Sequence, residues 1–199
     1  QLGAEEFGQE VHVFAPAFTK RDLQELLPIA HHISFNSFTQ WNVHRETVAA
    51  SDHSISCGLR VNPGYSEVEV EIYDPCAKGS RLGIPLEAFE GQSLDGIEGL
   101  HFHALCEQDS GTLAGVLYSF EERFNHWLPQ MKWVNFGGGH HITSPTYDRE
   151  RLVRIIREFQ ERHPNLEVYL EPGEAIAINT GVLVATVLDI VRNEIDIAI

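Results

Sequence analysis

Short apolar segments and amphipathic segments alternate along the chain. The short segments are rich in Val, Ile and Phe and end at Pro, Gly, Asn or Ser, which is typical of β-strands. They predict strands over residues 11–16, 32–37, 54–62, 97–105, 132–138 and 167–173. Apolar residues at helical spacing predict helices within residues 19–30, where Thr19 is the expected cap, and within 112–128 and 148–163.

This order of elements predicts parallel strands joined by right-handed crossovers. Six strands fit an open doubly wound sheet or part of an eight-stranded barrel. No GxGxxG motif follows the first strand, which disfavours a dinucleotide-binding sheet. Polar or glycine residues end several different strands, as in barrel enzymes: Asn36, Arg60, His103, Gly137 and Glu171. We predict an α/β fold, an incomplete (β/α)8 TIM-type barrel with about six of its eight strands, the other two preceding residue 1.

The pattern changes near the C-terminus. The segment "AIAINTGVLVATVLDIVRNEIDIAI" predicts a short helical piece and then two apolar β runs around a turn at Asn193. We predict that residues 1–180 form the barrel domain and that residues 181–199 begin a β-rich C-terminal domain. The chain has no initial Met and ends on a strand-like segment, so we expect it to be a piece of a longer protein.

Residues 63–84, "PGYSEVEVEIYDPCAKGSRLGI", form a long insertion after the third predicted strand. The alternation within "SEVEVEIYD" is compatible with a further strand. Long loops on this side of a barrel either shape the substrate pocket or run over the surface. Both interpretations of this insertion stay open from the sequence.

Composition narrows the function classes. The formal charge is −15, from 14 Lys and Arg against 29 Asp and Glu, which argues against nucleic-acid binding and is compatible with a cationic ligand. No apolar run is long enough for a membrane span, and the acidic N-terminus does not resemble a signal peptide. The three cysteines show no CxxC spacing, so we expect neither a zinc cluster nor disulfides, and a cytoplasmic location.

Two histidines stand two residues apart in "GLHFHALCEQDS", residues 99–110. On a strand, His101 and His103 point to the same face. Such a pair is compatible with a metal site completed by His140, His141 or Glu171, and equally with stacked or hydrogen-bonded histidines.

Three other segments carry candidate chemistry. Gly137, Gly138 and Gly139 follow a strand directly and suit either a phosphate-binding nest or a tight turn. Glu171 ends a strand at "LEPG", where it can bind a ring nitrogen or a cation, or cap nearby amides. Arg60 lies inside an apolar strand and needs an anionic partner, which is either a ligand or a structural acid.

Taken together, "GLHFHALCE", "NFGGGHH" and "LEPG" on successive strand ends resemble the fold-type III pyridoxal-phosphate decarboxylases, the ornithine/diaminopimelate decarboxylase-like barrels related to alanine racemase. The segments "FNSFTQW", "WVNFGGGHHIT" and "EPGEAIAINTGVLVATVLDIV", with the insertion, resemble more narrowly the carboxynorspermidine/carboxyspermidine decarboxylases. This likeness covers essentially the whole chain.

The resemblance implies a role for each matching residue. It implies that His103 stacks on the pyridine ring of pyridoxal 5'-phosphate and that Glu171 pairs with its ring nitrogen. It places the cofactor phosphate on the glycine turn and Arg60 near the cofactor. Cys106 stands where relatives often have a phosphate-contacting Ser, and Glu174 stands where many have the Arg of EPGR. We expect Glu174, together with His141, to bind the cationic substrate.

The resemblance also implies what this chain lacks. The family needs a lysine that forms a Schiff base with the cofactor. The chain has only Lys20, Lys78 and Lys132, none of them at the C-terminal end of a predicted strand. No catalytic lysine is therefore identified, and we expect the chain as given to be inactive by itself.

The resemblance predicts decarboxylation of carboxynorspermidine or carboxyspermidine to norspermidine or spermidine, in polyamine biosynthesis. It also implies a homodimer with active sites shared between subunits, and no nucleic-acid or membrane partner. We expect no metal in that reaction. Two alternatives stay open: a metal-dependent barrel hydrolase that uses His101, His103, His141 and Glu171, and a non-catalytic fragment of a cofactor-binding barrel.

Overall fold

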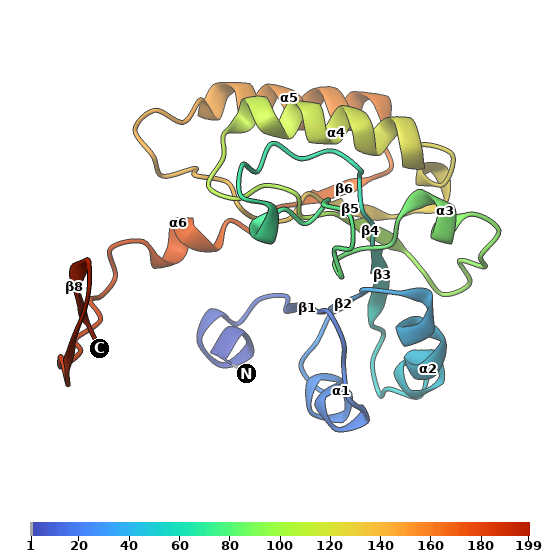
Figure 1. Cartoon of the computed structure of the whole chain (residues 1–199). Helices are drawn as coiled ribbons and strands as arrows, with labels where there is room; N and C mark the ends of the chain where they lie inside the picture. Colours follow the sequence, from blue (N-terminus) through green and yellow to red (C-terminus); the bar gives the residue numbers. More distant parts are fainter. Residues whose placement is uncertain (1) are drawn as a thin grey trace.

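The computed structural model describes residues 2–199, and its main feature is one sheet of six parallel strands in sequence order. The strands are β1 (His12–Ala15), β2 (His32–Phe35), β3 (Ser56–Arg60), β4 (Gly99–His101), β5 (Trp133–Asn135) and β6 (Glu167–Tyr169). All six predicted strands are confirmed, with shorter bounds. The sheet is curled. The rings of His12 on β1 and Tyr169 on β6, its two edge strands, lie only 4.5 Å apart across its concave face. This is the predicted incomplete barrel (Figure 1).

Helices connect the strands. They are α1 (Lys20–Leu26), α2 (Phe38–Ala49), α3 (Leu86–Phe89), α4 (Ser110–Phe124), α5 (Arg149–Arg162) and α6 (Gly173–Ala177), with short turns η1 (Gly3–Phe7), η2 (Glu71–Tyr73) and η3 (Leu128–Gln130). The three predicted helices are confirmed as α1, α4 and α5. Thr19 caps α1 in a capping box with Asp22. Helix α2 was not expected from the sequence pattern, and it buries only Trp41, His44 and Val48.

Helices α4 and α5 cover one stretch of the outer face of the sheet (Figure 1). Beneath them, Phe102 and Phe136 stack with ring centroids 5.3 Å apart. Phe120 of α4 lies 4.9 Å from Phe102, and Phe159 of α5 lies 5.1 Å from Phe136. Because side chains alternate along a strand, this outward position of Phe102 turns its neighbours His101 and His103 toward the interior.

Aromatic packing fills the interior below the strand ends. A Cβ added to Gly99 would lie 2.0 Å from the Trp133 ring, and one added to Gly58 would lie 2.3 Å from it. Two glycines on neighbouring strands therefore make room for one indole. The Trp133 Nε1 donates to Ser56 Oγ at 2.8 Å, which satisfies its only polar group.

The compatible strand within "SEVEVEIYD" does not form, and that interpretation was wrong. Residues 66–74 contain only η2, with local hydrogen bonds from Tyr73 N to Val70 O and from Asp74 N to Glu71 O. An alternating segment becomes a strand only where a neighbouring strand offers backbone partners. These residues instead form a loop beside the carboxyl ends of the sheet.

The C-terminal residues form a separate antiparallel hairpin of β7 (Ile190–Asn193) and β8 (Ile195–Ala198), as Figure 1 shows. The two predicted β runs are thereby confirmed in part, since the strands start later than the apolar run does. The turn residue is Glu194, at φ +62°, and not Asn193, which pairs with Ile195. The domain boundary at residue 180 stays a prediction.

Candidate active site

A cavity of about 600 Å³ opens at the carboxyl ends of the strands. Four of the predicted site residues line it: Arg60, His103, Cys106 and Glu171. The strands end here in parallel, so residues far apart in sequence converge at one edge. Tyr73, from the loop after β3, also lines the cavity, so part of the insertion forms its wall.

Glu171 lies two residues beyond β6, and its two carboxylate oxygens have different neighbours. Asn135 Nδ2 donates to Oε1 at 2.7 Å. His101 Nε2 lies 3.6 Å from Oε2, which is longer than a hydrogen bond. The carboxylate is about one-third exposed, so it is held in place and still reachable from the cavity.

Both histidines of the HFH motif lie near the Glu171 carboxylate. One ligand atom each from His101, His103 and Glu171 lies within 4.8 Å of the others, so the predicted shared face is confirmed. Complete burial lowers the pKa of His101 well below its ordinary value, and the charge of Arg60 lowers it further. Burial lowers the pKa of His103 to about 4, again with Arg60. Both rings are therefore neutral at pH 7, and the contact of His101 with Glu171 is not an ion pair.

Arg60 is a buried cation at the end of β3. Its guanidinium Cζ lies 4.6 Å above the Phe14 ring, and one of its nitrogens donates to the His103 carbonyl at 3.0 Å. Burial lowers the pKa of Arg60 to about 10, while the charge of Glu171 acts to raise it. The guanidinium stays protonated at neutral pH and gives the cavity a fixed positive charge.

The glycine turn packs tightly against the end of β4. Gly137 and Gly139 have φ of +72° and +79°. A Cβ on Gly139 would lie 2.0 Å from the Leu105 carbonyl oxygen, so only glycine fits there. The Gly137 N–H donates to Asn135 Oδ1 at 2.8 Å, and the Gly138 N–H donates to His103 Nδ1 at 3.3 Å. Two of the three amide N–H groups thus already donate to side chains, whereas the N–H groups of a phosphate-binding nest point at the anion.

Glu174 and His141 bind each other. The His141 Nε2 and a Glu174 carboxylate oxygen form a short contact, with both side chains about one-third exposed. Within residues 2–199, neither residue lines the 600 Å³ cavity. Glu174 stands in the first turn of α6, and this pairing is a feature that the sequence did not predict.

The three lysines lie away from the cavity lining. Lys132 precedes β5 at the opposite edge of the sheet and pairs with Glu98. Lys20 begins α1 and is exposed, and Lys78 lines a different, loop-bounded cavity. Within the described residues, no lysine lines the cavity with Glu171.

The residues around the cavity fit pyridoxal phosphate. A held carboxylate, a neutral histidine beside it and a buried arginine are the groups that a protonatable ring and an anionic phosphate require. The glycine turn lets the backbone approach this edge closely. The same three residues, His101, His103 and Glu171, also suit a divalent cation, although His141 pairs with Glu174 instead of joining them.

Two residues that complete this site were missed from the sequence. Asn135 links the glycine turn to Glu171, and Phe14 lies beneath Arg60. The available signal was the alternation along each strand, which places position 135 on the inner face beside position 101. Their register pairing bears this out, since His101 and Asn135 are cross-strand partners.

No family model matches the chain. The sheet nevertheless has the barrel fold of decarboxylases. A crystal structure of diaminopimelate decarboxylase superposes with a TM-score of 0.69 at 15% identity, over 96% of this chain and 48% of that one. SrLDC in complex with PLP and cadaverine superposes with a TM-score of 0.60 at 16% identity, over 85% and 44%. The class of fold is therefore that of the pyridoxal-phosphate barrel decarboxylases.

More similar relatives narrow the likeness. The chain is 46% identical over 199 residues to the carboxynorspermidine/carboxyspermidine decarboxylase of Campylobacter jejuni, covering 51% of it. It is 45% identical over 192 residues, 96% of this chain, to the carboxyaminopropylagmatine decarboxylase of a Synechocystis species, covering 49% of it. A crystal structure of the C. jejuni carboxynorspermidine decarboxylase with norspermidine has a TM-score of 0.78 at 44% identity, over 98% of this chain and 49% of that one.

These relatives confirm the resemblance to the carboxynorspermidine/carboxyspermidine decarboxylases that the sequence motifs predicted. The chain spans about half the length of the curated relatives it matches.

Proposed function

We propose that these 199 residues are part of a pyridoxal-phosphate-dependent decarboxylase that acts on carboxynorspermidine or carboxyspermidine. The observation that carries the proposal is Glu171, a partly exposed carboxylate fixed at the cavity by Asn135 and bordered by two neutral histidines. The relative at 46% identity supports this substrate, whereas the relative at 45% identity is named for carboxyaminopropylagmatine.

The cofactor, when bound, supplies an electron-accepting ring that stabilises the carbanion left by loss of CO₂. In this proposal Glu171 binds the protonated ring nitrogen and keeps the proton there. His103 would pack against the ring from the cavity wall. Arg60 would place its positive charge near the anionic groups of the cofactor, and the glycine turn and Cys106 would bind its phosphate.

The proposed substrate is a polyamine with one carboxylate. An acidic chain of net charge −15 favours the approach of such a cation. Glu174 supplies one negative charge beside the strand ends, shared with His141. We propose that this pair contacts the amine-bearing part of the substrate, on the basis of the motif position alone.

Two wider proposals accompany this one. A homodimer with shared active sites follows from the resemblance, and sedimentation of the protein that carries these residues tests it. A cytoplasmic location is in keeping with three free cysteines, Cys57, Cys76 and Cys106. Within residues 2–199 no helix has the length and apolar character needed to cross a membrane.

Cofactor binding by the chain tests the site. Equilibrium dialysis of pyridoxal phosphate against the 199-residue chain should show binding, and Glu171→Gln should weaken it by at least about tenfold, since the ring nitrogen loses its charged partner. Glu90→Gln, at an exposed glutamate after α3, is the matched control. A folded chain without affinity for pyridoxal phosphate would contradict the site.

Activity is tested separately on the protein that carries these residues. Norspermidine or spermidine formed from the carboxylated precursor is measured by chromatography, with and without added pyridoxal phosphate. The proposal requires product that depends on the cofactor. Cofactor-dependent decarboxylation of lysine or diaminopimelate alone would assign a different substrate to the same fold.

A further inference from the structure

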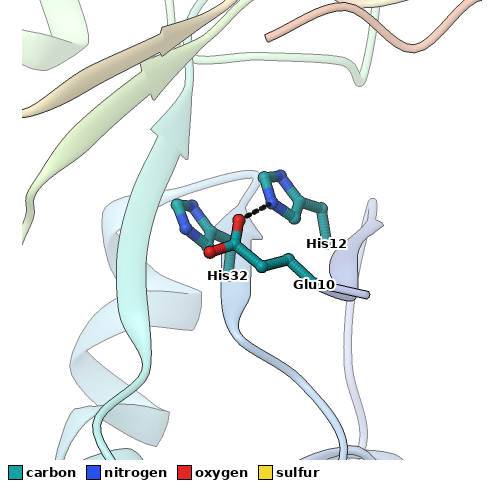
Figure 2. Close-up of side chains that lie close together, drawn as sticks. All are labelled: Glu10, His12 and His32. Carbon is teal, nitrogen blue, oxygen red and sulfur yellow. Dashed lines mark hydrogen bonds and ion pairs between the residues drawn. The ribbon is translucent and has the colours of Figure 1, made fainter. Parts of the chain in front are cut away.

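A second group of histidines lies toward the amino ends of the first two strands, and one of its members, His12, also lines the 600 Å³ cavity. His12 begins β1 and His32 begins β2, and the two are register partners on neighbouring parallel strands. Glu10 precedes His12 by two residues, which suits the same face of an extended segment. Figure 2 shows the three side chains converging, with the Glu10 carboxylate beside both rings.

The distances between these groups suit coordination. One ligand atom from each of Glu10, His12 and His32 lies within 4.8 Å of the others. His12 Nε2 and Glu10 Oε2 are 3.4 Å apart. Metal–ligand bonds of about 2.0–2.2 Å in tetrahedral geometry separate ligand atoms by roughly 3.3–3.6 Å, so one pair already has the required spacing.

The two imidazoles are stacked, with centroids 4.0 Å apart and planes inclined by 6°. Ring-nitrogen lone pairs lie in the ring plane, so a shared ion requires one ring to turn about its Cβ–Cγ bond. That torsion is broad and costs little for histidine. Closing the site therefore needs side-chain rotation and no movement of the strands.

Aromatic side chains contact both rings, and one ring nitrogen is left without a hydrogen bond. Tyr169 contacts His12 edge-on at 4.5 Å, and Trp133 lies 5.2 Å from His32. Among the described residues, the buried His32 Nδ1 has no hydrogen-bond partner. An orphaned buried nitrogen costs free energy, and an electrophile would remove that cost.

We propose that Glu10, His12 and His32 form a binding site for a divalent transition-metal ion of the Zn²⁺ type. Two imidazole nitrogens and one carboxylate oxygen are the donors that such ions prefer. Three protein ligands leave the fourth position to water. The ion would join the segment before β1 to β1 and β2.

The charges near this site agree with a cation. Burial and the neighbouring His12 lower the pKa of His32, although Glu10, Glu167 and Glu98 act to raise it. Glu98 is paired with Lys132 and Ser56, whereas Glu10 is exposed and, among residues 2–199, has only His12 at hydrogen-bond distance.

Zinc titration of the tag-free, chelator-treated 199-residue chain tests the proposal, with a chromophoric chelator as competitor. The wild-type chain should bind Zn²⁺, and His12→Gln or His32→Gln should weaken binding by more than about tenfold. His103→Gln separates this site from the His101, His103 and Glu171 group and should leave one zinc bound. His126→Gln, at an exposed histidine that follows the C-terminal end of α4, controls for the loss of any histidine.

Circular dichroism shows whether each variant folds. If His32→Gln does not fold, Glu10→Gln keeps the test open, because Glu10 is exposed and its removal disturbs no packing. Unchanged zinc affinity in His12→Gln and Glu10→Gln would overturn the proposal. So would zinc binding that disappears only in His103→Gln, or a folded wild-type chain that binds no zinc.

Discussion

Asn135 is the residue on which the geometry of the proposed site depends most. Its amide donates to Glu171 at 2.7 Å and accepts from Gly137 N at 2.8 Å, and the residue is 2% exposed. Asn135→Ala leaves the buried Gly137 N–H without its acceptor and Glu171 Oε1 without this donor, which costs about 1–3 kcal/mol. We expect that loss in urea unfolding, together with weaker binding of pyridoxal phosphate. Asn165→Ala, at an exposed turn position, should change neither.

Asn135→Asp tests the same contact through charge. The variant keeps the shape and places a carboxylate 2.7 Å from Glu171 Oε1 in place of the amide donor. Two carboxylates this close raise the pKa of one of them. The destabilisation should therefore be larger at pH 8 than at pH 5. Equal destabilisation at both values would show that Asn135 acts by shape alone.

Glu174 offers a test of substrate binding at the residue scale. If Glu174 holds an amine of the substrate, Glu174→Gln should raise KM for the carboxypolyamine several-fold and leave kcat nearly unchanged, because uniform binding is lost. The assay uses the protein that carries these residues. His141→Gln is the companion variant, since His141 shares the carboxylate. An unchanged KM in Glu174→Gln contradicts the assignment.

Residues at the carboxyl edge of the sheet could be predicted from the sequence, whereas the side chains that contact them could not. Arg60, His103 and Glu171 were predicted from their places at strand ends, because strand bounds and alternation are local properties. The bond between Asn135 and Glu171 joins positions 36 apart in sequence, and the stacking of His12 on His32 joins neighbouring strands. Such contacts depend on register and curvature, which apolar patterns do not specify.

The glycine turn after β5 provides a prediction for an element. Gly139→Ala adds a Cβ 2.0 Å from the Leu105 carbonyl oxygen at φ +79°. Backbone strain and overpacking together should lower the free energy of unfolding by at least about 2 kcal/mol. In Gly173→Ala the new Cβ meets nothing within 4 Å, so its unfolding should match the wild type. Urea unfolding of the two variants compares them directly, and equal stability would refute the tight turn.

The strands were predictable as elements because each carries a dense apolar run. Helix α2 was not, because its sequence "FTQWNVHRETVA" buries only three side chains and shows little amphipathic contrast. The loop from residue 63 to 84 shows the reverse case, because its sequence was compatible with a strand that does not form. Its alternation matched a strand, but the nearest backbone partners are local and it forms η2. Tertiary partners decide such segments, and local patterns do not show them.

At the scale of the whole molecule, the C-terminal hairpin tests the predicted division at residue 180. All residues from 181 to 199 are exposed, and the hairpin forms a sheet of its own. Removing residues 181–199 should therefore change the free energy of unfolding of the sheet by less than about 0.5 kcal/mol. It should also reduce self-association, since Val182, Leu183 and Val184 are exposed apolar residues. A large loss of stability would place the hairpin within the barrel domain.

The interior histidines make the stability of the whole chain depend on pH. Burial lowers the pKa of His103 and of His140 to about 4, and that of His101 well below its ordinary value of 6.5. The unfolded chain therefore binds protons between pH 6.5 and 4 that the folded chain does not, so stability falls as pH falls through this window. His103 and His140 should each contribute roughly 1.6 kcal/mol of loss between pH 6.5 and 5.

Urea unfolding at pH 7 and at pH 5 measures this loss. His140→Gln should make the difference between the two values smaller, because one buried ring no longer resists protonation, whereas His126→Gln should leave it unchanged. Glu98 and Glu121 do not produce the same effect, because burial raises their pKa but the hydrogen bonds from Lys132 and Arg162 outweigh it and hold each pKa below its ordinary value, so their contribution is lost only at lower pH. A pH dependence that is the same in His140→Gln as in the wild type would mean that the ring is protonated in the folded chain.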